Sequence, residues 1–239
     1  MNDINKKNSI LKKILVYYKQ YGFKFTFFIG LRYCYNYIYN KFFDIFYNIE
    51  TSDIVQLDKI ETKSFYKNNA AHYAPSPINL INISLFVISN IRYKPEIFID
   101  IGCGKGRVVF LAAKSRKFKK IIGIDFDPNL VHIAYKNLSK IKHLRYKNTI
   151  FFYNFDAANY LIKEEKQCLI YFFNPFDEFI LELFLKNNIV SFKKYHHIIV
   201  YLNDKYKEIL IKMGFINIYN YTDAYTAINY KNISFWIFL

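Results

Sequence analysis

The stretch that most constrains the fold of this chain runs from Ile97 to Ala113 and reads IFIDIGCGKGRVVFLAA. An apolar run contains an acid near its end, three glycines follow at alternate positions, and an apolar helical pattern then begins. Glycine adopts positive φ and lets the backbone approach a neighbour closely, and the first turn of a helix offers unpaired N–H groups. This order of residues predicts a buried strand, a tight ligand-binding turn and a helix.

The rest of the C-terminal part repeats the alternation of apolar strand and amphipathic helix. The expected strands are 97–102, 121–125, 149–154, 168–173 and 196–203, and the expected helices are 78–91, 107–117, 128–140, 177–192 and 205–213, with Ser76 and Asp127 as N-caps and Gly214 as a C-cap. Two final extended segments, 215–221 and 233–239, have no helix between them and predict an antiparallel hairpin. The fold class is therefore α/β, with a doubly wound, mostly parallel seven-stranded sheet and an antiparallel edge hairpin.

An N-terminal helical extension, residues 1–70, is predicted to precede a domain of residues 71–239. Residues 11–46 carry apolar and aromatic residues at spacings of three and four with lysines between them, which predicts one or two helices broken near Gly22 or Gly30. We expect their apolar face to pack on the domain. The alternative is a basic amphipathic segment in peripheral contact with an anionic membrane. Residues 51–72 look irregular, with at most a short strand at 53–57.

The totals of the chain exclude several classes of protein. With 239 residues, 53% of them hydrophobic, the chain can bury a large core. No apolar stretch reaches the roughly 18–20 residues of a transmembrane helix, and no secretory leader is recognisable. Three cysteines, far apart, favour neither a disulfide framework nor a zinc site, so we expect a cytoplasmic protein without a metal. The net charge of +15 comes mostly from lysine and is interpreted as a solvated surface, an anionic partner being the alternative.

The D-I-G-C-G-K-G order resembles the first motif of the class I S-adenosylmethionine-dependent methyltransferases. It differs from the G-x-G-x-x-G fingerprint of dinucleotide-binding folds, because Arg107 occupies the third glycine position. The resemblance implies S-adenosyl-L-methionine as the cofactor and S-adenosyl-L-homocysteine as the product. Asp100 would then hold the methionine amino group and Asp125 the ribose hydroxyls. The other cofactor contacts that the resemblance implies are Gly102, Cys103, Gly104, Gly106, Phe126, Asp156 and Ala157, with capping of the next helix as the alternative role of Asp156.

A second motif, Asn174-Pro175-Phe176, follows the expected fourth strand. It resembles the [DN]-P-P-[YF] loop of amino-directed methyltransferases, although the second proline is absent. The resemblance implies that Asn174 and the Pro175 carbonyl accept hydrogens from a target nitrogen while the Phe176 ring packs nearby. A simple turn, with Asp177 capping the next helix, is the alternative.

Tyr73 lies in HYAPSP (72–77) and is the fourth candidate catalytic residue, either covering the site or anchoring the helix that follows. The Y-x-P-[ST]-P, D-x-G-x-G-K-G-R and N-P-F motifs together are similar to those of a poorly characterised bacterial group of class I methyltransferases. These motifs predict a methyltransferase whose acceptor is a protein, a nucleic acid or a small molecule. The alternatives are a cofactor-binding module without catalysis, acting through its basic N-terminal segment, and a nucleotide-dependent oxidoreductase.

Overall fold

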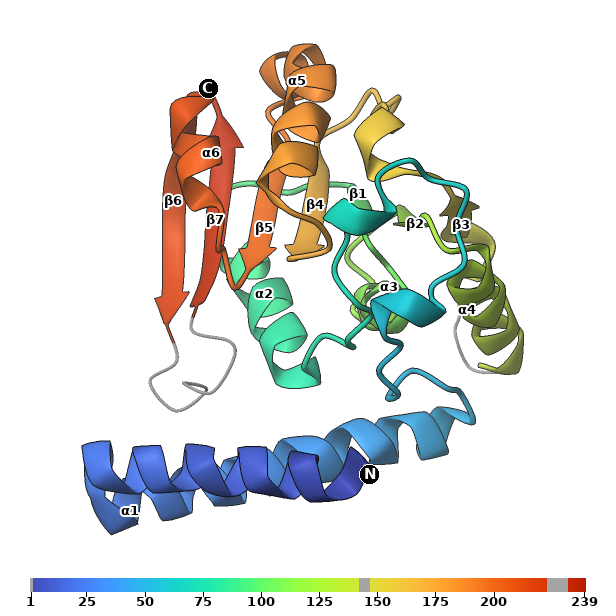
Figure 1. The fold of residues 1–239 in the computed structure, drawn as a ribbon. Coiled ribbons are helices and arrows are strands. Elements are labelled where there is room, and N and C mark those ends of the chain that lie inside the picture. The colour runs from blue at the N-terminus through green and yellow to red at the C-terminus, as the bar shows by residue number, and fades with distance from the viewer. Residues whose placement is uncertain (1, 142–146, 223–231) are drawn as a thin grey trace.

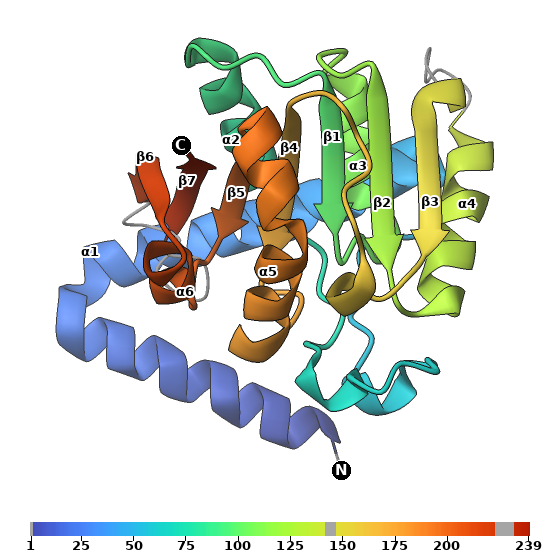
Figure 2. The same cartoon turned by 90° about the horizontal axis from the view of Figure 1, so that it is seen from above.

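The computed structural model describes residues 2–141, 147–222 and 232–239. Its centre is one seven-stranded sheet with the strand order β3-β2-β1-β4-β5-β7-β6 (Figures 1 and 2). The strands are β1 (Ile97–Ile101), β2 (Lys120–Asp125), β3 (Ile150–Asn154), β4 (Cys168–Phe173), β5 (Ile198–Leu202), β6 (Phe215–Thr222) and β7 (Asn232–Phe238). The first five are parallel, and β7 is antiparallel to both β5 and β6. The predicted fold class and edge hairpin are confirmed.

Helices cover both faces of the sheet. One face carries α2 (Ile78–Asn90), α3 (Arg107–Lys114) and α4 (Pro128–Lys140), and the other carries α5 (Glu178–Tyr195) and α6 (Lys207–Lys212). Four 3-10 turns complete the ordered elements: η1 (Leu57–Lys59), η2 (Lys67–Asn69), η3 (Lys147–Thr149) and η4 (Ala157–Asn159). Burial on two faces explains why β1 reads as a continuous apolar run instead of an alternating one.

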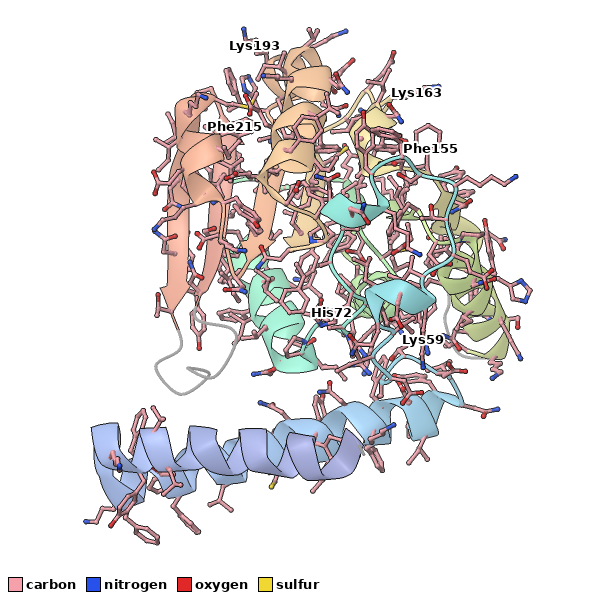
Figure 3. The ribbon with its side chains drawn as sticks, in the orientation of Figure 1. Lys59, His72, Phe155, Lys163, Lys193 and Phe215 are labelled. Carbon is pink, nitrogen blue, oxygen red and sulfur yellow. The ribbon has the colours of Figure 1, made fainter. Side chains whose placement is uncertain are left out.

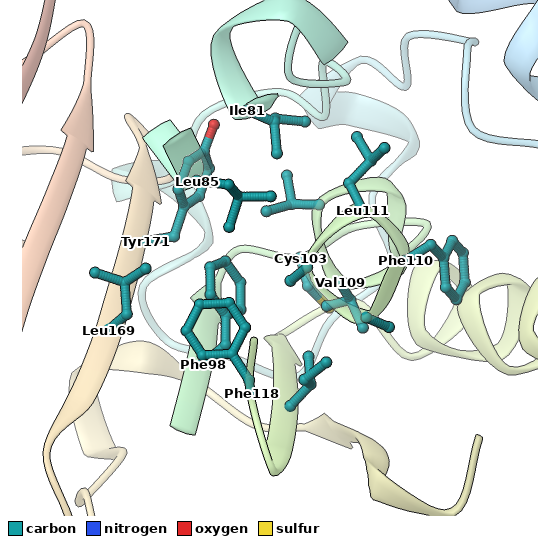
Figure 4. Close-up of a cluster of buried hydrophobic side chains, with 14 of the residues drawn as sticks. Ile81, Leu85, Phe98, Cys103, Val109, Phe110, Leu111, Phe118, Leu169 and Tyr171 are labelled. Carbon is teal, nitrogen blue, oxygen red and sulfur yellow. The ribbon is translucent and has the colours of Figure 1, made fainter. Parts of the chain in front are cut away.

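Strand β1 shows how the two cores form, because successive side chains of a strand point to opposite faces. Phe98 packs with Leu169 and Tyr171 of β4 beneath α2 and α3, and several members of this cluster are seen in Figure 4. Ile99 belongs to the second cluster, below α5. Neither Phe98 nor Ile99 is more than 1% exposed. The sheet is thus fixed by packing on both sides, and the loops at its ends are held in place.

Local signals located most helix ends. Asp127 caps α4 and accepts a hydrogen bond from the Asn129 N–H (2.8 Å), with proline in the first turn. Gly214 follows α6 with a φ of 89°. The N-cap prediction at Ser76 was wrong, because α2 begins at Ile78 and its extended N-cap residue is Pro77.

Helix α1 (Asn2–Tyr47) is broken at Gly22, where φ is 76° and ψ is 175°. This is one of the two predicted break points. The expected packing of its apolar face on the domain holds only at the last turns, where Phe43 belongs to the buried core and Tyr47 packs against it. Many other large apolar side chains from Leu15 to Phe46 are exposed. Near its C-terminal end, Phe43 and Asp44 are buried. Charge explains the orientation, since the polar side of this helix end contacts a buried arginine of the domain.

Arg107, the first residue of α3, provides that contact and is only 2% exposed. Its guanidinium donates to Thr51 Oγ1 (2.8 Å), Ser52 Oγ (2.8 Å) and Asn40 Oδ1 (3.1 Å), and it lies 3.5 Å from Asp44 Oδ1. Thr51 in turn donates to both carboxylate oxygens of Asp44, from Oγ1 (2.5 Å) and from its N–H (2.8 Å). This network joins residues 40–52 to the glycine loop. The division of the chain near residue 70 stays a proposal.

Residues 48–77, called here the covering segment, connect α1 to α2 across the carboxyl ends of the strands (Figure 1). Val55 and Tyr73 form an isolated antiparallel bridge. The sequence had predicted at most a short strand at 53–57. Thr62 Oγ1 donates to the Phe126 carbonyl (2.9 Å), and a second isolated bridge joins Ala70 to the loop after β4. The segment therefore closes over the end of the sheet where ligands bind in such folds.

Replacing Arg107 by methionine should destabilise the protein by roughly 3 kcal/mol, because the buried Asp44 carboxylate loses its counter-ion. Urea denaturation followed by circular dichroism measures this change. Arg92→Met is the matched control, since Arg92 is exposed, and it should shift stability by less than about 0.5 kcal/mol. Equal midpoints for the two variants would contradict the structural role assigned to Arg107.

Candidate active site

A cavity that is partly open to solvent lies at the carboxyl ends of β1, β2 and β4. This is where the strand order reverses, because β2 and β3 lie on one side of β1 and β4 and β5 on the other. Ten of the predicted site residues line it: Tyr73, Asp100, Gly102, Asp125, Phe126, Asp156, Ala157, Asn174, Pro175 and Phe176. The fold thus brings together residues that are up to 103 positions apart in the chain.

Three predicted cofactor residues, Cys103, Gly104 and Gly106, are not among those that line the cavity. Cys103 is buried in the core beside α3 (Figure 4). Gly106 has a φ of 89° and begins α3, and a Cβ there would lie 2.9 Å from Phe110 and 3.0 Å from Phe152. In this structure these three residues form the turn on the side away from the cavity. Their contact with a cofactor stays a prediction.

The glycine loop is in close contact with the chain itself. A Cβ on Gly102 (φ 81°) would lie 2.4 Å from Cβ of Pro175, and one on Gly104 (φ 50°) would lie 2.0 Å from Cε2 of Tyr73. The sequence suggested that these glycines make room for a ligand. In the structure, Pro175 and the Tyr73 ring occupy the space beside them, so the absence of a Cβ at Gly102 and Gly104 lets both residues pack against the glycine loop.

Asp125 ends β2 and is 6% exposed. Its Oδ2 accepts from the Gly104 N–H (2.8 Å) and its Oδ1 from the Asp127 N–H (3.0 Å). Burial raises the pKa of this carboxyl to about 6, although both hydrogen bonds favour the charged form. Each oxygen keeps a further lone pair, so the residue can still accept from the two hydroxyls of a ribose.

Asp100 provides the clearest indication of a missing ligand. The residue is 2% exposed, and among the described residues its Oδ2 has no hydrogen-bond partner. Burial, and next the charge of Asp125, raise the pKa of the Asp100 carboxyl well above its usual value. A buried carboxylate without a partner is costly, and a bound ammonium group would satisfy it. The site therefore fits the amino group of S-adenosylmethionine.

Asp156 follows the end of β3 and is one of the predicted cofactor contacts. Its Oδ1 accepts from the Ala158 N–H (2.9 Å) and caps η4, and Ser64 Oγ donates to its Oδ2. The capping role considered from the sequence is therefore present, and the residue lines the cavity as well. Its role toward a cofactor stays a prediction.

The loop after β4 combines a turn with a buried acceptor oxygen that has no hydrogen-bond partner among the described residues. Asn174 has a φ of 41°, and its buried Oδ1 has no hydrogen-bond partner within the described part of the chain. The Pro175 carbonyl already accepts from the Ala71 N–H (3.0 Å). Phe176 is 9% exposed and packs edge-on against Phe172. In this structure, Asn174 is thus the member of the motif that has an acceptor oxygen without a partner.

Tyr73 is fixed above the glycine loop. Its hydroxyl donates to the Thr51 carbonyl (2.9 Å), and Lys105 Nζ lies 5.9 Å from its ring centroid. Burial raises the pKa of the Tyr73 hydroxyl well above its ordinary value. Tyr73 is therefore a neutral covering residue at physiological pH and cannot act as a phenolate base.

The covering segment contributes residues to the cavity lining that the sequence did not predict. Ile60, Ser64, Tyr66 and His72 all line the cavity, and His72 is labelled in Figure 3. These residues lie in a stretch without helical or strand periodicity. Their positions depend on contacts with distant loops, such as that of Ser64 with Asp156.

Comparison with known proteins finds a family match over part of the chain. Residues 94–209 match a family model described as a methyltransferase domain. A protein-lysine N-methyltransferase of Saccharolobus islandicus (strain REY15A) is 29% identical over 68 residues, which are 28% of this chain and 41% of that protein. The chain thus spans less than half the length of this curated relative.

Solved structures show the same fold. The methyltransferase domain of bacterial CtHen1 superposes with a TM-score of 0.53 at 13% identity, over 67% of this chain and 97% of that one. A candidate RNA methyltransferase from Pyrococcus horikoshii superposes with a TM-score of 0.52 at 16% identity, over 77% of this chain and 94% of that one. At these identities the likeness concerns the fold alone.

Asp100→Asn should change stability and ligand binding in opposite directions. Removal of the unpartnered charge should raise the melting temperature of the free protein at pH 8, whereas loss of the charged acceptor should weaken S-adenosylmethionine binding by about 1.5–3 kcal/mol. Thermal unfolding and calorimetry measure the two effects. Asp58→Asn, at an exposed position of η1, is the control. A less stable variant with unchanged affinity would remove Asp100 from the site.

The buried carboxyl of Asp125 should make the free protein more stable in acid. Its native pKa of about 6 lies above the ordinary 3.8, so between these values the native state holds a proton that the unfolded chain has lost. The free energy of unfolding contributed by this group falls as the pH rises from about 4 to about 6, by up to roughly 3 kcal/mol.

Urea titrations of the wild type and of Asp125→Ala at several pH values measure this contribution together with its coupling to Asp100, whose pKa the charge of Asp125 also raises. The free energy of unfolding of the wild type, relative to that of the variant, should be highest near pH 4 and decline toward pH 7. A difference that is constant with pH would show that Asp125 titrates normally.

Proposed function

We propose, from the premise that this chain carries a class I S-adenosylmethionine-dependent methyltransferase domain, that it transfers a methyl group to a neutral amino nitrogen bound beside Asn174. The observation that carries the proposal is the buried Asn174 Oδ1 without a hydrogen-bond partner among the described residues. It lines the same cavity as the unpartnered Oδ2 of Asp100. The Asp100 oxygen suits the ammonium group of the cofactor, and the Asn174 oxygen suits an N–H of the acceptor.

Orientation is the contribution that Asn174 would make. When S-adenosylmethionine is bound, it supplies a methyl group already activated by a sulfonium. An amino group that donates one N–H to Asn174 Oδ1 has its lone pair held in a defined direction, which favours in-line attack. The carbonyl of Pro175 is engaged by Ala71. We therefore assign the main acceptor contact to the Asn174 side chain, whose Oδ1 has no partner among the described residues, although the Pro175 oxygen keeps a second lone pair.

Three titratable groups that line the cavity, Tyr73, Asp100 and Asp125, are unsuited to remove a proton from the acceptor, which favours a neutral acceptor; His72 and Asp156 line it as well. Tyr73 keeps its proton because burial raises its pKa. Asp100 and Asp125 would be occupied by the cofactor under this proposal, so neither would be free to accept a proton from the acceptor. A neutral amine needs no base before attack, and its excess proton can leave to solvent afterwards through the open side of the cavity.

The archaeal relative named a protein-lysine N-methyltransferase supports an amino acceptor as a class. The match covers 28% of this chain, so it suggests which acceptors to test first. Lysine-containing peptides lead that panel and are assayed at raised pH as well, because the ε-amine is mostly protonated below its ordinary pKa of about 10.4; small amines, RNA and DNA follow.

Asn174→Ala should lower kcat/KM for methyl transfer roughly 10- to 100-fold, the effect of removing one buried hydrogen bond worth about 1.5–3 kcal/mol. The affinity for S-adenosylmethionine should stay unchanged. Transfer of a radiolabelled methyl group to the acceptor panel and calorimetry of cofactor binding measure the two quantities. Asn90→Ala, at the exposed end of α2, is the matched control.

Two results would contradict the proposal. The first is a wild-type enzyme that methylates only oxygen acceptors, and the second is an Asn174→Ala variant with the full rate. Tight cofactor binding without any transfer across the panel would instead favour a binding module without catalysis.

A further inference from the structure

We propose that the outward face of α1 binds the surface of an anionic phospholipid membrane, an interaction separate from methyl transfer. The outward face consists of Phe23, Phe27, Leu31, Ile38, Phe42 and Ile45, whose exposed fractions are 69%, 53%, 52%, 65%, 60% and 75%. These residues follow one another at spacings of three, four and seven, so they form a single stripe along the helix after the break at Gly22.

The stripe is turned away from the domain. Phe43 and Asp44 are buried on the other side of the same helix, where Asp44 pairs with Arg107 (3.5 Å). Figures 1 and 2 show α1 lying beneath the layer of α2, α3 and α4, outside the body of the protein. The network around Arg107 therefore fixes which face of α1 remains uncovered.

A row of exposed aromatic and aliphatic side chains of this length requires a partner, because soluble monomers rarely present continuous apolar surface. Charge identifies the kind of partner. Residues 1–47 contain seven lysines and one arginine against two aspartates, a net charge of +6. Lys19 and Lys24 are exposed near the start of the stripe. Further exposed rings lie beside the stripe, at Phe28, Tyr35, Tyr37 and Phe46. An exposed apolar and aromatic surface with lysines around it suits the interface of an anionic bilayer.

The same observations disfavour other arrangements. Within the described residues, none of the helices combines the length and apolarity that crossing a bilayer requires. Pairing of two copies through α1 would bring two segments of charge +6 together, which is electrostatically unfavourable. A helix that lies in the membrane plane avoids both problems, since the lysines reach the phosphates while the rings enter the acyl boundary.

The test uses the full-length protein and vesicles of two compositions, phosphatidylcholine alone and phosphatidylcholine with about 30% phosphatidylglycerol, because only the second carries the negative surface potential. In co-sedimentation, the wild type should bind the anionic vesicles, bind the neutral ones at least about tenfold more weakly, and be released from the anionic ones by salt. Phe27→Asp/Phe42→Asp should reduce the partition coefficient at least about tenfold.

Two further variants separate the charge from the apolar stripe. Lys19→Gln and Lys24→Gln should each reduce binding about fivefold, the effect of one lysine near an anionic surface. Val190→Asp, at a 74% exposed position of α5, is the control and should bind as the wild type does. Circular dichroism and the affinity for S-adenosylmethionine should be the same in all variants, because the substituted side chains are outside the cavity.

Three outcomes would overturn the proposal. One is a wild type that ignores anionic vesicles, and another is equal binding by the wild type and the double phenylalanine variant. The third is a wild-type dimer, seen by light scattering, that the double variant converts to a monomer while neither protein binds lipid. None of these outcomes affects the proposed methyl transfer, which the acceptor panel tests in the absence of vesicles.

Discussion

The buried guanidinium of Arg107, in the first turn of α3, contacts polar groups from two places, the end of α1 and the start of the covering segment. A charge with 2% exposure is tolerable only because its donors are satisfied. The consequences reach the cavity, since Thr51 contacts both Arg107 and the hydroxyl of Tyr73. Through these contacts, Tyr73 is held against Gly104, where its ring covers part of the cavity.

Parallel pairing supplies the other half of the site. In the register of the sheet, Asp100 of β1 lies beside Gly123 of β2 and Tyr171 of β4, and the two strands β1 and β2 carry buried acids to the same edge. Burial raises the pKa values of both Asp100 and Asp125. The free protein thus keeps an electrostatically unfavourable arrangement that a cationic ligand relieves, a common cost of a functional site.

The residue at the third position of the dinucleotide fingerprint therefore has a structural role in this chain. Arg107 anchors α1 through Asp44, and the same contact leaves the stripe from Phe23 to Ile45 facing outward. The buried charge of Arg107 thus positions both the residues that cover the cavity and the face of α1 that is proposed to bind the membrane. A glycine at this position could provide neither.

The sequence by itself determined the seven-stranded order of elements, the helix cap at Asp127 and the break at Gly22, because these follow from local periodicity and backbone preference. It also placed the acids at strand ends. Only the tertiary structure decided which face of α1 is covered, since periodicity describes an apolar face but not the buried Arg107 that recruits the polar one. The path of the covering segment was likewise decided by the tertiary structure. Its sequence has no periodicity, and it is held by hydrogen bonds to residues far along the chain, as between Thr62 and Phe126.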